Sequence, residues 1–249
     1  MDKRIFAEVC CGSLDDALRA ESAGADRIEL NSCLFLGGLT PSMGTFLKAK
    51  EKLHIPIMVM VRPRGAGFFY TASEFEVMLA DAECFINNGA DGIVFGFLNE
   101  DGSVDYERCK RILAIIGEKE SVFHRAIDVV PEPLEALDKL AAIGVKRVLT
   151  SGQQATVREG IPLIAEMVKQ ASERIQVLPG GGINMGDVAE IVKNTGVNQV
   201  HVAALGVRMD KSTSGNLRIY YGGALYPPED RHEIADESML KCIIERAQI

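Results

Sequence analysis

A repeated helix-to-strand junction is the feature of this sequence that most constrains its fold. Four times a helical pattern ends in glycine, followed by Ala or Val, two mostly polar residues and an apolar run: GADRIEL from Gly24, GADGIVFG from Gly89, GVKRVLTSG from Gly144 and GVNQVHVAAL from Gly196. Glycine suits the left-handed residue that closes a helix, and an apolar run suits a buried strand. Each repeat therefore predicts a helix that leads into a strand.

Four more strand candidates lie between these repeats, at residues 4–10, 56–62, 121–127 and 175–180, each followed by a helical pattern. Strict alternation of strand and helix predicts parallel strands, either in an open doubly wound sheet or in a closed barrel. Eight units without a break for a second domain favour an α/β fold, a TIM (β/α)8 barrel that forms a single domain over residues 1–249. We expect the polar stretch 206–216 to be a mobile loop and a closing helix to begin at about Glu229.

Composition and charge exclude several classes of protein. A chain of 249 residues with 47% hydrophobic content can bury a large core. The net charge of -8 is spread along the chain, without a Lys/Arg-rich block, so we expect no nucleic-acid partner. The first apolar run is too short for a signal sequence, and no window approaches the roughly 18 apolar residues of a membrane span. We expect a cytoplasmic protein with no membrane partner, whose six cysteines are reduced thiols.

The barrel prediction also indicates where functional side chains gather. Active sites of such barrels lie at the carboxyl ends of the strands, where inward-facing residues alternate with outward-facing ones. Polar residues alternate with apolar ones at several predicted strand ends, with Cys10, Asn31 and Arg64 among them. The candidate catalytic residues at this rim are Glu8, Glu29, Arg62, His124, Asp128 and His201.

Structural roles compete with this interpretation. A Glu-Arg pair inside a barrel, such as Glu29 with Arg62, can serve only to neutralise two buried charges. Arg125 has the opposite parity from His124, and a pairing with a helix suits it as well as a functional role. His54 and His232 are predicted to be surface residues, the first before a strand and the second in the tail helix.

A glycine-rich loop follows the seventh predicted strand, in the sequence LPGGGI. Gly180, Gly181 and Gly182 allow backbone N–H groups to form an anion-binding concavity beside a helix N-terminus, the usual phosphate position in these barrels. Thr150 and Ser151, after the sixth strand, are candidate hydroxyl donors to the same ligand. A tight turn without a ligand is the alternative.

Seven ordered motifs, EVCCGS, GADRIEL, GGLTPS, VMVRPRG, FHRAID, RVLTSG and LPGGGI, closely resemble the CutC family of copper-homeostasis proteins. The resemblance covers roughly Glu8 to Leu205. It implies a (β/α)8 barrel, intracellular copper handling, a homo-oligomer (dimer or larger), and Cu(I) binding through cysteines near the ends of the first two strands. The first such cysteine matches Cys10. The second falls on Asn31, so Cys33 is the substitute candidate, and the family's HCSAR reads HVAAL here.

Three hypotheses about function remain open. Copper handling is placed first because of the resemblance, and Cu(I) prefers sulfur ligands, which Cys10, Cys33, Met58 and Met60 offer, although Met and Cys are also ordinary core residues. A lyase or isomerase acting on a small phosphorylated or carboxylated substrate is the second, with Glu8 or Glu29 as base and His124 or His201 as acid. The third is a non-catalytic metabolite binder. A Schiff-base aldolase is disfavoured because no lysine lies at an inward strand end.

Overall fold

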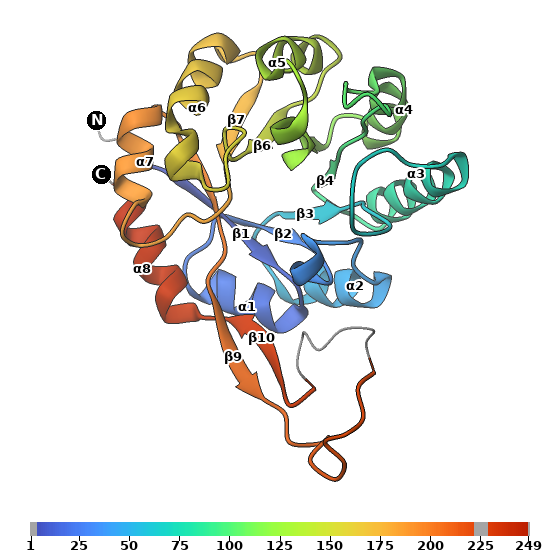
Figure 1. Cartoon of the computed structure of the whole chain (residues 1–249), viewed down its shortest axis with the longest axis vertical. Helices are drawn as coiled ribbons and strands as arrows, with labels where there is room; N and C mark the ends of the chain where they lie inside the picture. The colour runs from blue at the N-terminus through green and yellow to red at the C-terminus, as the bar shows by residue number, and fades with distance from the viewer. Residues whose placement is uncertain (1–3, 222–228, 249) are drawn as a thin grey trace.

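Eight parallel strands form a nearly closed barrel in the computed structural model, which describes residues 4–221 and 229–248 (Figure 1). The strands are β1 (Phe6–Cys11), β2 (Arg27–Leu30), β3 (Ile57–Met60), β4 (Gly92–Phe95), β5 (Glu120–Phe123), β6 (Arg147–Thr150), β7 (Gln176–Pro179) and β8 (Gln199–Val202). Neighbours in sequence pair from β1 to β7, and β8 pairs with β1. A parallel bridge between Gly180 and His201 joins the ends of β7 and β8. The predicted (β/α)8 barrel is thereby confirmed.

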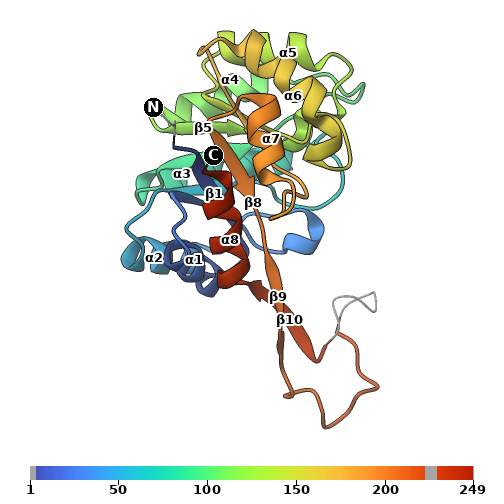
Figure 2. The same ribbon diagram turned by 90° about the vertical axis from the view of Figure 1, so that its left-hand side faces the viewer.

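Helices follow the strands and surround the barrel (Figures 1 and 2). They are α1 (Leu14–Ser22), α2 (Met43–Lys52), α3 (Ala72–Asn87), α4 (Tyr106–Ile116), α5 (Pro133–Ala142), α6 (Val157–Ala171), α7 (Val188–Thr195) and α8 (Glu237–Ala247). Two short 3-10 helices, η1 (Leu34–Leu36) and η2 (Arg125–Val129), lie after β2 and β5. No helix within the described ranges is long and apolar enough to cross a membrane.

The helix-to-strand junctions have the predicted backbone geometry. Gly24, Gly89, Gly144 and Gly196 all have positive φ, between 71° and 94°, in the region that glycine adopts without steric cost. Side-chain caps begin the helices: the hydroxyls of Thr71 and Thr156 each accept from a backbone N–H of the first turn and form capping boxes. The repeated junction is therefore a local signal that fixes where each helix stops and each strand begins.

The barrel interior contains two chemically different regions. An apolar cluster of inward side chains fills one part, formed by Met58, Met60, Val94, Val122, Leu149 and Leu178. A polar network fills another: Arg27 donates to Glu8 and Gln199, and Arg147 donates to Gln176 and Glu120. Because buried polar groups are stable only when they are hydrogen-bonded, this network constrains how β1, β2, β5, β6, β7 and β8 pack around the axis.

Three predicted boundaries require correction. Strand β5 ends at Phe123, and its predicted continuation to Ile127 is instead the start of η2, so parity does not place Asp128. Residues 205–209 form strand β9 (Leu205–Met209) in place of the start of the predicted loop, and pair with β10 (Arg231–Ala235). The closing helix begins at Glu237, later than Glu229, because β10 precedes it. Residues 1–3, 222–228 and 249 of the predicted single domain lie outside the described ranges.

The antiparallel pair β9–β10 projects away from the barrel as a long hairpin (Figures 1 and 2). His232 lies exposed in β10, and not in the tail helix as predicted. Large apolar side chains along the hairpin and its connection are exposed, among them Val207 (64%), Met209 (54%), Leu217 (70%) and Tyr221 (78%).

Candidate functional site

A pocket of about 330 Å³ opens at the carboxyl ends of the barrel strands. Its lining comes from β1, β2, β3, β6 and β8 and from the segments after β2, β3 and β5, and consists of Cys10, Glu29, Gly37, Met60, Arg62, Phe68, His124, Arg125, Asp128, Val129, Leu149 and His201. Five of the six candidate catalytic residues, all but Glu8, line this one pocket. The alternation of strand residues therefore brings distant parts of the chain together at the barrel mouth.

Glu8 lies beneath the pocket and holds His201 in place. Its side chain is 1% exposed, forms an ion pair with Arg27, and accepts from His201 Nδ1 at 2.7 Å. Burial alone would raise the pKa of Glu8, but Arg27 and His201 outweigh burial and hold it below its usual range. Glu8 is therefore a carboxylate that orients His201, and of the two glutamates it is Glu29 that lines the pocket.

Cys10, Glu29 and His201 form a compact group, called here the mouth triad. One ligand atom from each lies within 4.8 Å of the others. Cys10 Sγ lies 3.7 Å from Glu29 Oε2, and His201 Nε2 lies 3.9 Å from the same oxygen. Asn31 Nδ2 donates to Glu29 Oε2 at 2.8 Å and approaches Cys10 Sγ at 3.5 Å. Thiol, imidazole and carboxylate are the groups with which proteins bind transition metals.

Burial and the neighbouring side chains together set the protonation of the mouth triad. It raises the pKa of the Cys10 thiol to about 12, and it raises the pKa of Glu29 as well. Burial alone would lower the pKa of His201, but Glu29, Cys10 and Glu8 together raise it well above its usual value. Near neutral pH the mouth triad therefore contains a thiol and an imidazolium.

Arg62 and His124 form the other side of the pocket. Arg62 Nη1 donates to the carbonyls of Leu36 and Gly38, and Nη2 donates to that of Ala66, so backbone oxygens hold the guanidinium. The predicted alternative of a structural pair between Glu29 and Arg62 does not occur among the described contacts; the buried Glu-Arg pair is that of Glu8 with Arg27.

Phe68 joins these two side chains. The Arg62 guanidinium carbon lies 5.3 Å from the centroid of the Phe68 ring, whose centroid lies 4.7 Å from that of His124. The His124 ring also packs directly on Gly96, where an added Cβ would overlap the imidazole. Burial and the charge of Arg62 lower the pKa of His124 to about 3, so its ring is neutral.

Asp128 occupies the position predicted to receive a ligand's anion. Its carboxylate accepts from Thr150 Oγ1 at 2.5 Å, from the N–H and hydroxyl of Ser151 at 3.0 Å, and from Arg125 Nε at 2.8 Å. The hydrogen-bond donors of Thr150 and Ser151 are therefore already engaged by a protein carboxylate. Arg125 pairs with Asp128 inside the short helix η2 and donates to Ser151 after β6.

The glycine loop is shaped by the same contacts. Gly181 has a φ of 130°, and a Cβ there would lie 3.3 Å from the Arg125 guanidinium. Gly180 donates to the carbonyl of Thr150 at 2.9 Å, and Gly182 has a φ of 76°. A tight turn without a ligand is consistent with the positive φ of Gly181 and Gly182, and binding of an anion by the three glycines stays a prediction.

Other sequence candidates lie apart from the barrel mouth. Cys33 is exposed and lines a separate pocket near Phe35 and His232. Arg64 pairs with Glu74 on the surface, and Met58 is buried in the apolar cluster. The side chain of His54 is 92% exposed, as predicted for a surface residue.

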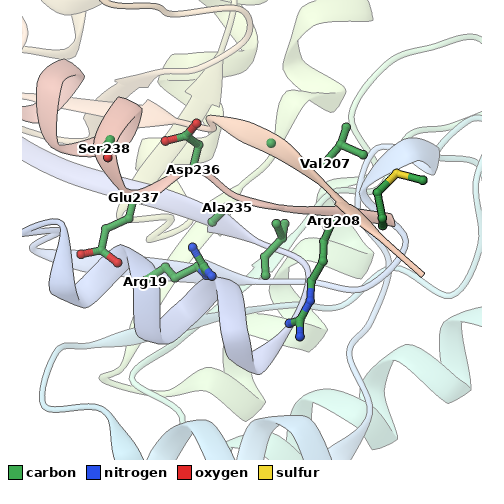
Figure 3. A pocket seen from close by; sticks show the side chains of 10 residues that line it. Arg19, Val207, Arg208, Ala235, Asp236, Glu237 and Ser238 are labelled. Atoms are coloured by element: carbon green, nitrogen blue, oxygen red, sulfur yellow. The ribbon is translucent and has the colours of Figure 1, made fainter. Parts of the chain in front are cut away.

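A second cavity, of about 710 Å³, lies at the base of the hairpin and not at the barrel mouth (Figure 3). Its lining includes Arg19, Arg208, Asp236 and Glu237, whose charges of both signs face an open groove. We assign the chemistry to the smaller pocket, because that one collects buried groups with unmade hydrogen bonds.

Sequence reasoning missed three residues that shape the barrel mouth. Arg27 was read as a polar position at the start of a strand, yet it is 6% exposed and neutralises Glu8. Phe68 lies in a loop whose sequence carries no periodic signal. Gly96 was counted only as part of an apolar run, although a glycine immediately after a buried strand was available as a signal for close approach of another group.

Comparison with known proteins identifies the family that this chain matches. The chain matches the CutC family model over residues 5–206. It is 57% identical to a family protein CutC of Treponema denticola, over 97% of this chain and 98% of that protein. It is 42% identical to the human copper homeostasis protein cutC homolog, over 95% of this chain and 86% of that protein.

A solved structure agrees with the fold. The structure of the putative copper homeostasis protein CutC from Streptococcus agalactiae superimposes with a TM-score of 0.76 and 34% identity, and covers 79% of this chain and 97% of that one.

Proposed function

This chain belongs to the CutC family, and on that premise we propose that it serves copper homeostasis by binding Cu(I) at the mouth triad. The observation that carries the proposal is the approach of one thiol, one imidazole and one carboxylate to within 4.8 Å at the barrel mouth. Cu(I) selects soft thiolate ligands and accepts imidazole, so Cys10 and His201 are its ligands and Glu29 supplies negative charge beside it.

The hydrogen bond between His201 and Glu8 supports this assignment. His201 Nδ1 donates to Glu8, which directs Nε2 toward Glu29 and Cys10. A carboxylate that accepts from the distal nitrogen of a ligating histidine fixes the ring and increases its basicity, as in many metal sites. Glu8 therefore acts as the orienting group for the metal ligand.

Cu(I) binding at this group must displace protons. The Cys10 thiol is protonated in the metal-free protein, because burial raises its pKa to about 12, and the pKa of His201 is also raised. Both ligands lose a proton when they bind metal, so affinity increases with pH. Cu(I) that arrives on a carrier molecule would exchange with these protons.

The second cysteine position of the family limits the donor set. Asn31 stands there, and its amide nitrogen already approaches Cys10 Sγ and Glu29 Oε2. Cys33 lines a different pocket. The mouth triad therefore offers one sulfur ligand, which predicts weaker Cu(I) binding than a two-thiolate site would give.

Location and assembly belong to the same proposal. We place the protein in the cytoplasm, a location supported by six free cysteines, which persist in a reducing compartment.

We also propose a homo-oligomer formed through the hairpin β9–β10. An isolated two-stranded hairpin is marginally stable in water, and its exposed Val207 and Met209 suit an interface. Sedimentation equilibrium tests this: a monomer at micromolar concentration would contradict it.

A Cu(I) titration with matched cysteine variants tests the metal site. Protein kept under anaerobic reducing conditions competes for Cu(I) with a chromogenic chelator. Cys10→Ser should weaken binding by about 100-fold or more, equivalent to about 2.7 kcal/mol. Cys33→Ser, which changes an exposed thiol outside the mouth triad, is the matched control and should leave the affinity unchanged. Equal affinity in Cys10→Ser and the parent would refute the site.

A further inference from the structure

The barrel-mouth pocket contains three buried polar atoms that copper does not explain together. Within residues 4–221 and 229–248, Glu29 Oε1, Arg62 Nε and His124 Nε2 have no hydrogen-bond partner, and all three residues line the same pocket. Their exposed fractions are 2%, 6% and 3%. A buried polar group without a partner costs roughly 1–3 kcal/mol, so three in one pocket indicate a ligand that completes them.

Arg62 provides a fixed positive charge. Of its five N–H groups, Nη1 and Nη2 direct three to backbone carbonyls, the Tyr70 hydroxyl lies beside the guanidinium, and Nε has no partner of its own among the described atoms. The backbone oxygens carry no formal charge, so the guanidinium charge has no carboxylate partner in the described part of the chain. Asp128, the nearest acidic group on η2, is already held by Arg125, Thr150 and Ser151. The charge of Arg62 is therefore available to an anionic ligand.

His124 provides a neutral donor beside that charge. Its Nδ1 accepts from the backbone N–H of Ala126 at 3.1 Å, so the proton of the neutral ring lies on Nε2. Contact with Phe68 and Gly96 holds the ring in place. Two N–H donors, one charged and one neutral, thus flank Phe68, and both present hydrogen atoms to the pocket. They require oxygen acceptors.

Glu29 provides the complementary group. Its Oε2 accepts from Asn31, while Oε1 is free. A ligand hydroxyl suits this oxygen, because a hydroxyl both donates and accepts and therefore pairs with the ionised or the protonated carboxyl. Met60, Phe68 and Leu149 add apolar walls, and a volume of about 330 Å³ admits only a small molecule.

We propose that the barrel mouth binds a small 2-hydroxy carboxylate. Its carboxylate accepts from Arg62 Nε and His124 Nε2, and its hydroxyl bonds Glu29 Oε1. The proposal goes beyond copper binding: it shares Glu29 with the mouth triad but rests on Arg62 and His124, which lie outside it. The site then has two halves, a metal-binding side at Cys10 and His201 and an organic-anion side at Arg62 and His124.

Calorimetric titration of chelator-treated, full-length protein with L-lactate, D-lactate, glycolate and propionate tests the proposal. At least one of the hydroxy acids should bind with a Kd below about 1 mM. Propionate, which lacks the hydroxyl, should bind at least about 10-fold more weakly than lactate, because Glu29 then stays unpaired. Failure of all three hydroxy acids to bind, or equal binding of lactate and propionate, would overturn the proposal.

Paired variants of His124 locate the bound molecule. His124→Asn keeps an acceptor near Nδ1 for the Ala126 N–H but removes the Nε2 donor, and should weaken hydroxy-acid binding by about 10-fold. His124→Gln restores an N–H near the Nε2 position and should recover most of the affinity. Unchanged affinity in His124→Asn would overturn the assignment even if the protein binds lactate.

A control addresses the other cavity that contains arginines. Arg208→Met alters the pocket at the base of the hairpin, where Arg19 and Arg208 offer a competing place for a carboxylate (Figure 3). This variant should bind lactate as the parent does. Loss of binding in Arg208→Met would place the anion at the hairpin and contradict the proposal. All of these hydroxy-acid titrations use metal-free protein. A negative result in them would therefore refute hydroxy-acid binding without bearing on the Cu(I) titration, so the two proposals can be tested separately.

Discussion

Replacement of Glu8 by glutamine tests the buried charge network on which the barrel mouth depends. Glu8 is 1% exposed, and its carboxylate neutralises Arg27, which is 6% exposed, and orients His201. Glutamine has nearly the same shape and still offers an oxygen acceptor. The substitution therefore removes charge with little change in packing.

The magnitude follows from the burial of both partners. Removing one member of a buried ion pair costs about 3–5 kcal/mol, because the remaining charge stays in a medium of low polarity. The amide oxygen of glutamine retains a hydrogen bond to Arg27, so we expect a loss of unfolding free energy at the lower end of this range, about 3 kcal/mol. For a chain of this length each kcal/mol shifts Tm by about 2–4 °C, which predicts a decrease of about 6–12 °C.

Urea unfolding at several pH values provides the assay. The folded pKa of Glu8 lies below its usual value, so the carboxylate stabilises the fold above its unfolded pKa of roughly 4.3, and this contribution is lost as pH falls through the folded pKa. Parent and Glu8→Gln should therefore differ at pH 7 and at pH 5, and converge in more acidic solution. Adding Arg27→Met to Glu8→Gln should restore part of the stability. A loss below about 1 kcal/mol at pH 7 would refute this reasoning.

Three further predictions concern the metal, the anion position and the backbone. The logarithm of Cu(I) affinity should rise with pH with a slope between about one and two near neutral pH, because Cys10 and His201 each release a proton, and a flat profile would contradict their assignment as ligands. Asp128→Asn should lower the free energy of unfolding by about 1–3 kcal/mol in urea titrations, since the charged acceptor of several hydrogen bonds is lost. Gly160→Ala should cost about 1–3 kcal/mol because its Cβ would overlap a backbone carbonyl of the loop after β6, whereas Gly67→Ala, with open space around it, is the matched control and should be nearly neutral.

Local signals made the fold predictable from the sequence. Gly24, Gly89, Gly144 and Gly196 mark junctions whose positive φ depends only on neighbouring residues, and the apolar runs after them have no other place than a buried sheet. Eight such units leave few arrangements. The hairpin β9–β10 was not predicted, although Leu205, Val207 and Met209 alternate along β9, because its two strands pair across a long connection that sequence spacing does not reveal.

The sequence indicated which residues gather at the barrel mouth, but not which of them form ion pairs and hydrogen bonds with one another. Alternation along the strands brought Glu29 and His201 to one rim, and this needs no contact information. Which charges pair depends on tertiary geometry: Arg27 and not Arg62 meets a glutamate, and Asp128 fills the position expected for a ligand. The pairing of charged side chains depends on distances between strands, and the spacing of residues in the sequence does not encode these distances.

X-ray absorption at the copper edge, on anaerobic protein loaded with one equivalent of Cu(I), tests the central claim most directly. A mouth-triad site predicts one sulfur and at least one nitrogen or oxygen in the copper coordination shell, with the sulfur signal absent in Cys10→Ser and intact in Cys33→Ser. Two sulfur ligands, or a sulfur signal that disappears in Cys33→Ser, would contradict copper binding at Cys10, Glu29 and His201.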